Sequence, residues 1–398
     1  MSVKGASAFL SSTHVCSIDA SDERGRCTLL QTVTAAFQNH VEIGFLSQGG
    51  SDPARPQKVN QDSYFMATLM SQGDMARNTM DRCYTCAGVL DGHGLKGHLV
   101  SQYFAQQLPL HLHQHLKELV DDQLILLPRD ENNIRPSSSS SSSSTDNVIN
   151  MVASSSSSSS LPSSSSWMEL EEQLQRLSGL SAEELAYHEL KPVHDQAMIR
   201  AFHSVHWASM QHVNVPAGRN GATCVMVLLD HGSNELHVAY VGDSRVIQVA
   251  MLDEVVSDSK NVEVLALSQE TTIKMESERE RVKAGGGYIR GNNVFYGPVG
   301  IAMTRSLGNA ALLRAGVVPT PITKTFPLLP NATIVLGTDG IWDVLTNHAV
   351  AELLVANPNV QTACDEIARV ARSKWVGDLP IVDEEKVDDI TIVLLRPL

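Results

Sequence analysis

Three short aspartate motifs, far apart in the chain, constrain the fold more than any other feature of the sequence. They are Asp-Gly-His-Gly at 91–94, Thr-Asp-Gly at 338–340 and Asp-Asp-Ile-Thr at 388–391. Each follows or opens a short apolar run of strand-like composition, so each carboxylate is expected at a strand end, where a sheet can direct it into a shared cleft. Carboxylates that converge repel one another unless a cation lies between them. Because carboxylate and carbonyl oxygens suit hard octahedral ions, the motifs predict a Mg²⁺ or Mn²⁺ cluster.

The composition predicts a globular protein and excludes several classes of partner. With 398 residues, of which 42% are hydrophobic, the chain can bury a large core. The longest apolar stretch, 222–229, is far too short to span a membrane, and residues 1–17 lack the pattern of a signal or transit peptide. The net charge of −14 opposes binding to nucleic-acid phosphates or anionic lipid. We expect neither nucleic acid nor membrane as a partner, and we expect a monomer.

The cysteines and a cluster of histidines invite metal-binding interpretations that their spacing does not favour. The six cysteines are scattered, as is typical of reduced thiols in the cytosol or nucleus. Cys83 and Cys86 have a Cys-x-x-Cys spacing, but no second ligand pair with zinc-finger spacing exists, and on a strand they point to opposite faces. His111 and His115, with His113 between them, would share one helical face. No nearby carboxylate completes a zinc set, so a solvated helix face is the favoured interpretation.

A serine-rich stretch interrupts the chain. Three serine runs between 137 and 166 leave almost nothing to bury, and we predict a disordered insert at about 129–166. Loop-closure entropy grows only logarithmically with length, so the insert can interrupt a single domain. The predicted organisation is an N-terminal extension at 1–40 and one domain at 41–398. Whether the tract is passive or a phosphorylated regulatory segment is open.

The periodicity outside this insert predicts a mixture of helices and antiparallel strands. Helices are expected at 95–127 with a break at Pro109, at 167–190, from Pro192 to Gln211, and near 350–374. Strands are expected at 222–229, 235–241 and 246–249, connected by a turn at 231–234. Strands in succession and helices elsewhere favour an α+β body with antiparallel sheets.

Further motifs give the chain a family resemblance. They are Asn-Gln-Asp at 60–62, Gly-Ala-Thr at 221–223, Gly-Asp-Ser-Arg at 242–245, Met-Thr-Arg-Ser-Leu-Gly at 303–308 and Gly-Ile-Trp-Asp at 340–343. In this order, together with the three aspartate motifs, they closely resemble the metal-dependent type 2C protein phosphatases, the PPM family. The resemblance runs from about residue 41 to the C-terminus and leaves out the N-terminal extension and the serine tract. One such motif would be weak evidence for the family, whereas this many motifs in the same order are strong evidence.

The resemblance implies both a fold and a metal centre. The fold is an α-β-β-α sandwich of two antiparallel sheets flanked by helices, with two Mg²⁺ or Mn²⁺ ions at one end. Asp91 is similar to the carboxylate that bridges both ions, and the carbonyl of Gly92 is similar to a ligand of one of them. Asp339 and Asp388 are similar to ligands of the other ion.

Other matching residues complete the implied site. Asp62 matches the acid that holds metal-bound waters, while Asp243 and Asp343, with Asp339, match a third, weaker metal site of some members. Phosphate monoesters hydrolyse slowly because an anionic ester repels nucleophiles and an alkoxide leaves poorly. Two metals address both problems by lowering the pKa of a bridging water and neutralising the phosphoryl oxygens. His93 is well placed to protonate the departing oxygen of phosphoserine or phosphothreonine in a protein substrate.

Departures from the family pattern leave alternatives open. Gln57 stands where members often carry a phosphate-binding arginine; Arg55 or Lys58 would have to substitute for it. Asn309 replaces the aspartate that usually follows Ser-Leu-Gly, and Gln61 replaces a frequent glutamate. The alternatives to a protein serine/threonine phosphatase are a pseudophosphatase that binds phosphoproteins without turnover, and a hydrolase of small phosphate esters.

Overall fold

The structure, a computed structural model, describes residues 14–16, 41–52, 58–71, 82–126, 192–251, 262–377 and 386–398. In this part of the chain the strands form two main sheets whose neighbouring strands are all antiparallel. The first sheet has the order β1 (His14–Cys16), β3 (Ser63–Ser71), β4 (Arg82–Leu90), β7 (Cys224–Asp230), β8 (Glu235–Val241) and β15 (Ile322–Pro327). The second has the order β10 (Val262–Ala266), β9 (Arg245–Met251), β16 (Ala332–Gly337), β17 (Ile390–Pro397) and β2 (Val41–Gln48).

The two sheets pack face to face because their central strands are apolar on both sides. Every residue of β7 is buried. Met226 and Leu228 belong to the hydrophobic core between the first sheet and its covering helices. Val225 and Val227 belong to the hydrophobic core between the two sheets. Alternation of side chains along a strand therefore fills two cores from one apolar run. This explains the continuous apolar sequence at 222–229.

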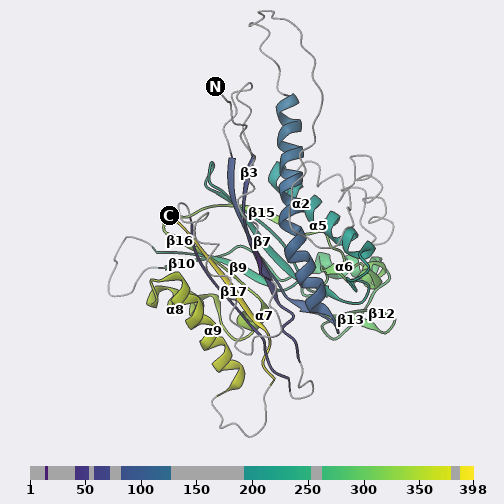
Figure 1. Ribbon diagram of the computed structural model, residues 1–398. Helices are drawn as coiled ribbons and strands as arrows, with labels where there is room; N and C mark the ends of the chain where they lie inside the picture. The colour runs from purple at the N-terminus through teal and green to yellow at the C-terminus, as the bar shows by residue number, and fades with distance from the viewer. Residues whose placement is uncertain are drawn as a thin grey trace, which may run out of the picture.

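Helices cover the outer face of each sheet (Figure 1). On the first sheet lie α2 (Gly97–Leu126) and α5 (Val193–Gln211), and on the second lie α8 (Asn347–Ala356) and α9 (Val360–Val376). The predicted α-β-β-α sandwich of class α+β is confirmed. No helix in the described ranges is long and apolar enough to cross a membrane.

Smaller elements lie beyond one end of the sandwich. A three-stranded sheet joins β14 (Leu307–Gly308), β6 (Gly221–Ala222) and β5 (Gly92–His93). Another joins β11 (Tyr288–Arg290), β12 (Asn293–Tyr296) and β13 (Val299–Ile301), next to α6 (Glu276–Ala284) and the 3₁₀ helix η2 (Ala310–Ala315). The short helix α7 (Asp339–Trp342) follows β16.

Two predictions about helices were wrong. Helix α2 continues through Pro109 without a break. Its apolar stripe Val100, Phe104, Leu108 and Leu112 is fully buried, and this packing offsets the cost of about 3 kcal/mol that an interior proline imposes. The helix expected near 350–374 is two helices, each with its own cap: the side chains of Thr346 and Asn359 accept backbone hydrogen bonds at the two N-termini.

The sequence suggested that the histidine cluster of α2 forms a solvated helix face, and this prediction was also wrong. His111 and His115 are buried against α5, where His111 Nδ1 lies 2.6 Å and His115 Nε2 3.4 Å from the hydroxyl of Ser204. Burial lowers the pKa of both histidines. They are polar members of a helix interface. The predicted serine-rich insert, the helix at 167–190, most of the extension at 1–40, and Arg55 lie outside the described residues.

Candidate active site

The predicted carboxylates lie at one end of the two central sheets. Asp91 directly follows β4, and Asp62 directly precedes β3, which pairs with β4. Asp339 is the first residue of α7, just after β16, and Asp388 lies two residues before β17, which pairs with β16. Antiparallel pairing places the end of one strand beside the start of its neighbour. The topology therefore brings together four acids that are up to 326 positions apart, from 62 to 388.

Burial and neighbouring carboxylates raise the pKa values of Asp62, Asp91 and Asp339. Burial, and then the charges of Asp339 and Asp62, raise the pKa of Asp91 well above its ordinary value. For Asp339 burial again comes first, and the charges of neighbouring carboxylates follow. Burial and the charge of Asp389 raise the pKa of Asp62 to about 8. Asp91, Asp339 and Asp388 nevertheless each keep part of their surface exposed, so a small ion can reach them.

These carboxylate oxygens are the type of donor that a hard divalent cation requires, although the side chains do not converge on a single point. Within the described ranges, no group of three or more His, Cys, Asp or Glu side chains is arranged as a finished metal site. However, Oδ1 of Asp62 and Oδ1 of Asp243 are both buried and accept no hydrogen bond from the described residues. A buried carboxylate oxygen without a donor is costly unless a cation or water meets it. The all-oxygen chemistry suits Mg²⁺ or Mn²⁺.

Asp62 is fixed by two threonines of the second sheet. The hydroxyl of Thr338 donates to Asp62 Oδ2 at 2.8 Å, and the backbone N–H of Thr391 donates to that same hydroxyl oxygen at 3.1 Å. The hydroxyl of Thr391 in turn lies 2.7 Å from that of Ser47 in β2. Oδ2 of Asp62 is thus anchored by a chain of hydrogen bonds that runs from Thr338, the N-cap of α7, to β17 and β2, while Oδ1 has no donor among the described residues.

The backbone at Gly92 leaves no room for a side chain. A Cβ there would collide with the carbonyl oxygens of Gln61 and Gly97, and the N–H of Gly92 donates to Gln61 at 3.1 Å. The position of the Gly92 carbonyl, the predicted metal ligand, is therefore set by the close approach of β5 to its neighbours.

His93 lies in β5 beside Asn309. The side-chain amide of Asn309 lies 2.5 Å from His93 Nε2, and the hydroxyl of Ser306 lies 3.4 Å from it. Burial lowers the pKa of His93 to about 4, and the backbone of Asp91 offsets this effect only in part. The imidazole is therefore neutral at neutral pH, with its Nε2 held against the amide.

Lys58, one of the two basic residues predicted to bind phosphate, has a different contact in the structure. Its ammonium lies 3.0 Å from Asp388 Oδ1 and 3.1 Å from Asp389 Oδ1, and its side chain is only 8% exposed. Burial opposes the charged form, but the charges of Asp389 and Asp388 raise its pKa. Lys58 thus holds a predicted metal ligand and is already paired with two anions.

Asp243 and Asp343, two of the predicted third-site residues, line a small pocket of about 150 Å³, and Asp339 is not part of its lining. Burial raises the pKa of Asp243 to about 6; a backbone hydrogen bond opposes this rise, and the charges of Glu270 and Asp343 add to it. Asp343 has its own pKa raised by burial and by Glu270. Glu270 binds Arg245 at 2.9 Å and also lines the pocket. Another acid therefore joins the two that the motifs had indicated.

Three residues of this region were not predicted as site residues. Asp389 accepts hydrogen bonds from the N–H groups of Gly50 at 2.7 Å and Gln61 at 2.9 Å, and it had appeared only as the second letter of a motif. Glu270 lies outside every motif named above. Asn309 was noted as a departure, but its contact with His93 joins positions 216 residues apart, and no sequence signal announces it.

Comparison with known proteins agrees with this fold. A family model described as "Protein phosphatase 2C" matches residues 113–378. The chain is 29% identical over 211 residues to "Probable protein phosphatase 2C 12" of Oryza sativa subsp. japonica, covering 50% of this chain and 52% of the relative. It is 26% identical over 329 residues to "Probable protein phosphatase 2C 1" of Arabidopsis thaliana, covering 79% of this chain and 60% of the relative. The chain thus spans about half the length of the first of these curated relatives and three fifths of the second.

A solved structure supports the fold. It is the "serine-threonine phosphatase 2C from Toxoplasma gondii", matched with a TM-score of 0.53 at 17% identity, over 90% of this chain and 96% of that chain. At this identity the likeness concerns the fold alone. The family match at 113–378 includes Asp243, Asp339 and Asp343, whereas Asp62, Asp91 and Asp388 lie beyond its ends.

Proposed function

Because the chain belongs to the protein phosphatase 2C family, we propose that it is a metal-dependent protein serine/threonine phosphatase. The observation on which this proposal depends is the convergence of carboxylates whose pKa values rise through burial and mutual repulsion. Such a group is stable in its charged form only when a cation offsets the repulsion. The substrates would be proteins that carry phosphoserine or phosphothreonine.

The proposed metal ligands are oxygen donors at one end of the sheets: Asp91, the carbonyl of Gly92, Asp339 and Asp388 for two Mg²⁺ or Mn²⁺ ions, and Asp243 with Asp343 for a third. Bound ions would supply a bridging water of lowered pKa as nucleophile and would neutralise phosphoryl charge. Asp62 would orient that water through Oδ1, since its Oδ2 is already bound by Thr338.

His93 would transfer a proton to the departing serine or threonine oxygen. With a pKa of about 4 it is neutral in the free protein at neutral pH. A phosphate dianion beside the imidazole favours the protonated form by opposite charge, so bound substrate would raise this pKa toward the working range. Asn309, in contact with Nε2, restricts the rotation of the ring.

One observation favours the pseudophosphatase as the second candidate. The ammonium of Lys58 binds Asp388, so metal binding at this acid has to displace or tolerate a buried cation. If the ammonium of Lys58 keeps the metal from Asp388, the protein would bind phosphoproteins without turnover.

The test is a phosphatase assay of the purified chain on a phosphothreonine peptide with Mn²⁺, repeated with EDTA. We expect hydrolysis with Mn²⁺ and none with EDTA, together with a melting temperature that rises as Mn²⁺ is added, since a ligand that binds the folded state stabilises it. Activity that persists in EDTA would defeat the proposal. Absence of both turnover and a Mn²⁺-dependent melting shift would favour the second candidate.

We also propose, from composition alone, that the protein works as a monomer in the cytosol or the nucleus.

A further inference from the structure

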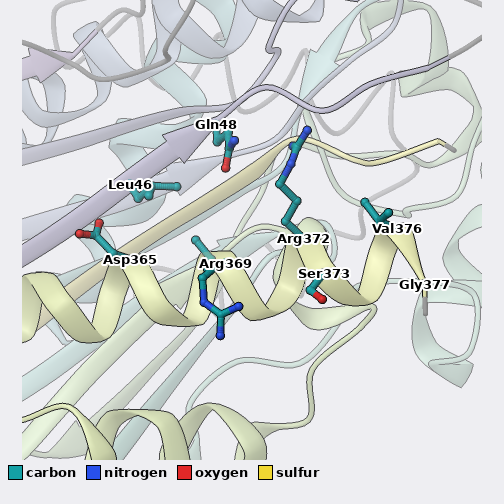
Figure 2. A pocket seen from close by; sticks show the side chains of 9 residues that line it. Leu46, Gln48, Asp365, Arg369, Arg372, Ser373, Val376 and Gly377 are labelled. Carbon is teal, nitrogen blue, oxygen red and sulfur yellow. The ribbon is translucent and has the colours of Figure 1, made fainter. Parts of the chain in front are cut away.

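A groove of about 440 Å³ runs between β2 and α9 on the outer face of the second sheet (Figure 2). It reaches the end of β2, where Gln48 is the last strand residue. Two residues further on, the N–H of Gly50 donates to Asp389, the neighbour of Asp388. Gln48 also pairs with Ile390, two residues after Asp388, so this end of the groove lies near the carboxylate end of the molecule. Its polar lining consists of Gln48, Asp365, Arg369, Arg372 and Ser373.

Two arginines of α9 line this groove, and they differ sharply. Arg369 is 66% exposed, binds Glu366 through two hydrogen bonds of 2.6 and 2.8 Å, and points away from β2 (Figure 2). Arg372 is only partly exposed and extends toward β2 (Figure 2). Its guanidinium donates to the carbonyl of Gly49 at 3.4 Å, and no carboxylate of the described residues forms an ion pair with it.

The surroundings make Arg372 suitable for binding an anion. A guanidinium has five N–H donors, and a single long bond to a neutral carbonyl leaves most of them available. The acid of the groove, Asp365, lies seven residues earlier on α9, about 10 Å along the helix axis, and already accepts a hydrogen bond from Gln361 at 2.9 Å. In a chain of net charge −14, a half-buried arginine near the site that forms no ion pair with an acid of the described residues is unusual.

Phosphate fits this position better than a carboxylate. The planar guanidinium matches two phosphoryl oxygens at once, and a phosphoryl group has a third acceptor oxygen. The amide of Gln48 points into the groove from the facing strand and can donate to that oxygen (Figure 2).

We propose that this groove binds a second phosphoryl group of the substrate, a few residues from the one that is hydrolysed, with Arg372 as the principal contact. The inference rests on the proposed function and narrows it: the favoured substrates are serine/threonine segments phosphorylated at more than one position.

The test compares synthetic peptides that carry one phosphothreonine with peptides that carry a phosphoserine two to five residues before or after it. A further set has glutamate in place of the second phosphoserine. For the wild-type chain with Mn²⁺, we expect kcat/KM to be about tenfold higher for the doubly phosphorylated peptide of the right spacing. Arg372→Ala should lose this preference and keep its activity on p-nitrophenyl phosphate. Arg369→Ala is the matched control, three residues away on the same helix, and should retain the preference.

Peptide binding in EDTA, followed by fluorescence anisotropy, tests the groove independently of turnover. Arg372→Ala should weaken the binding of the doubly phosphorylated peptide to that of the singly phosphorylated one. Three results would overturn the inference: no preference at any spacing, a preference that survives in Arg372→Ala, or equal preference for glutamate. Failure on p-nitrophenyl phosphate with selective binding intact would instead count against the proposed function alone.

Discussion

Two groups of buried charge in this molecule have opposite electrostatics. At the carboxylate end, Asp91 and Asp339 lie among like charges, and their pKa values are raised. In α6, Glu278 is bound by Arg281 at 2.6 and 2.7 Å and by Arg305 at 2.7 Å. Burial alone would raise the pKa of Glu278, but the hydrogen bonds from Arg281 and the charges of both arginines hold it well below its ordinary value. A buried carboxylate that is paired with arginines contributes to the stability of the fold. Carboxylates that lie close together without a cation between them instead indicate a binding site for a cationic ligand.

The largest expected effect is on catalysis. Asp339→Asn should lower kcat/KM on a phosphopeptide with Mn²⁺ about a thousandfold, because it removes a metal ligand and its charge. The melting temperature without metal should not fall, since the change relieves repulsion among the acids. Steady-state kinetics and thermal melting measure the two effects, with the exposed Glu352→Gln in α8 as control. A fall in melting temperature together with activity would show that Asp339 is structural, and the contrast with Glu278 would be lost.

The opposite pattern is expected at Glu278. Glu278→Gln leaves the guanidinium groups of Arg281 and Arg305 without their carboxylate, although their side chains are only 6% and 14% exposed. We expect the free energy of unfolding to fall by about 3–5 kcal/mol, measured by urea denaturation without metal. Glu276→Gln, on the same helix and in a largely exposed pair with Arg279, should change it by less than about 0.5 kcal/mol. Equal effects of the two substitutions would contradict the interpretation.

The dependence on pH sharpens the same contrast. Since the pKa of Glu278 is lower in the folded than in the unfolded chain, its contribution to stability is fully present above the ordinary value of 4.5 and is lost as the pH falls below it. Below that value the wild type should lose up to about 1.4 kcal/mol per pH unit from this group, and Glu278→Gln should lack this component. Urea unfolding of both proteins between pH 6 and 3 measures the difference. Parallel curves would show that the carboxylate gains nothing from its arginines.

The sequence predicts most of the strands and the acids at their ends, because both depend on local patterns. Apolar runs at 222–229 and 235–241 became β7 and β8 nearly as expected, and the aspartates lie at strand ends. Their position at strand ends suggested a shared cleft, but the individual roles in a metal site came only from the family resemblance, since topology, not spacing, brings the acids together. Which roles they play in catalysis stays a prediction.

What the sequence could not predict depends on contacts between distant segments. The continuation of α2 through Pro109 follows from packing against a sheet and a second helix. The contact of Asn309 with His93, and the binding of Lys58 to Asp388, join residues 216 and 330 positions apart. The pairing of Glu366 with Arg369 follows ordinary i,i+3 helical spacing, but the contact of Arg372 with the carbonyl of Gly49 joins residues 323 positions apart.

A third buried polar group, without net charge, should give the smallest effect. Ser204 of α5 lies between His111 and His115 of α2 and donates to the carbonyl of Ala201 at 3.1 Å. Both imidazoles are neutral because burial lowers their pKa, so Ser204→Ala removes a hydrogen-bond partner but strands no charge. We expect a loss of about 1–2 kcal/mol in the free energy of unfolding. Ser209→Ala on the same helix removes a hydroxyl that donates to the carbonyl of His206, and it should cost less. A loss as large as that of Glu278→Gln would mean that burial, not charge, determines how much these groups contribute.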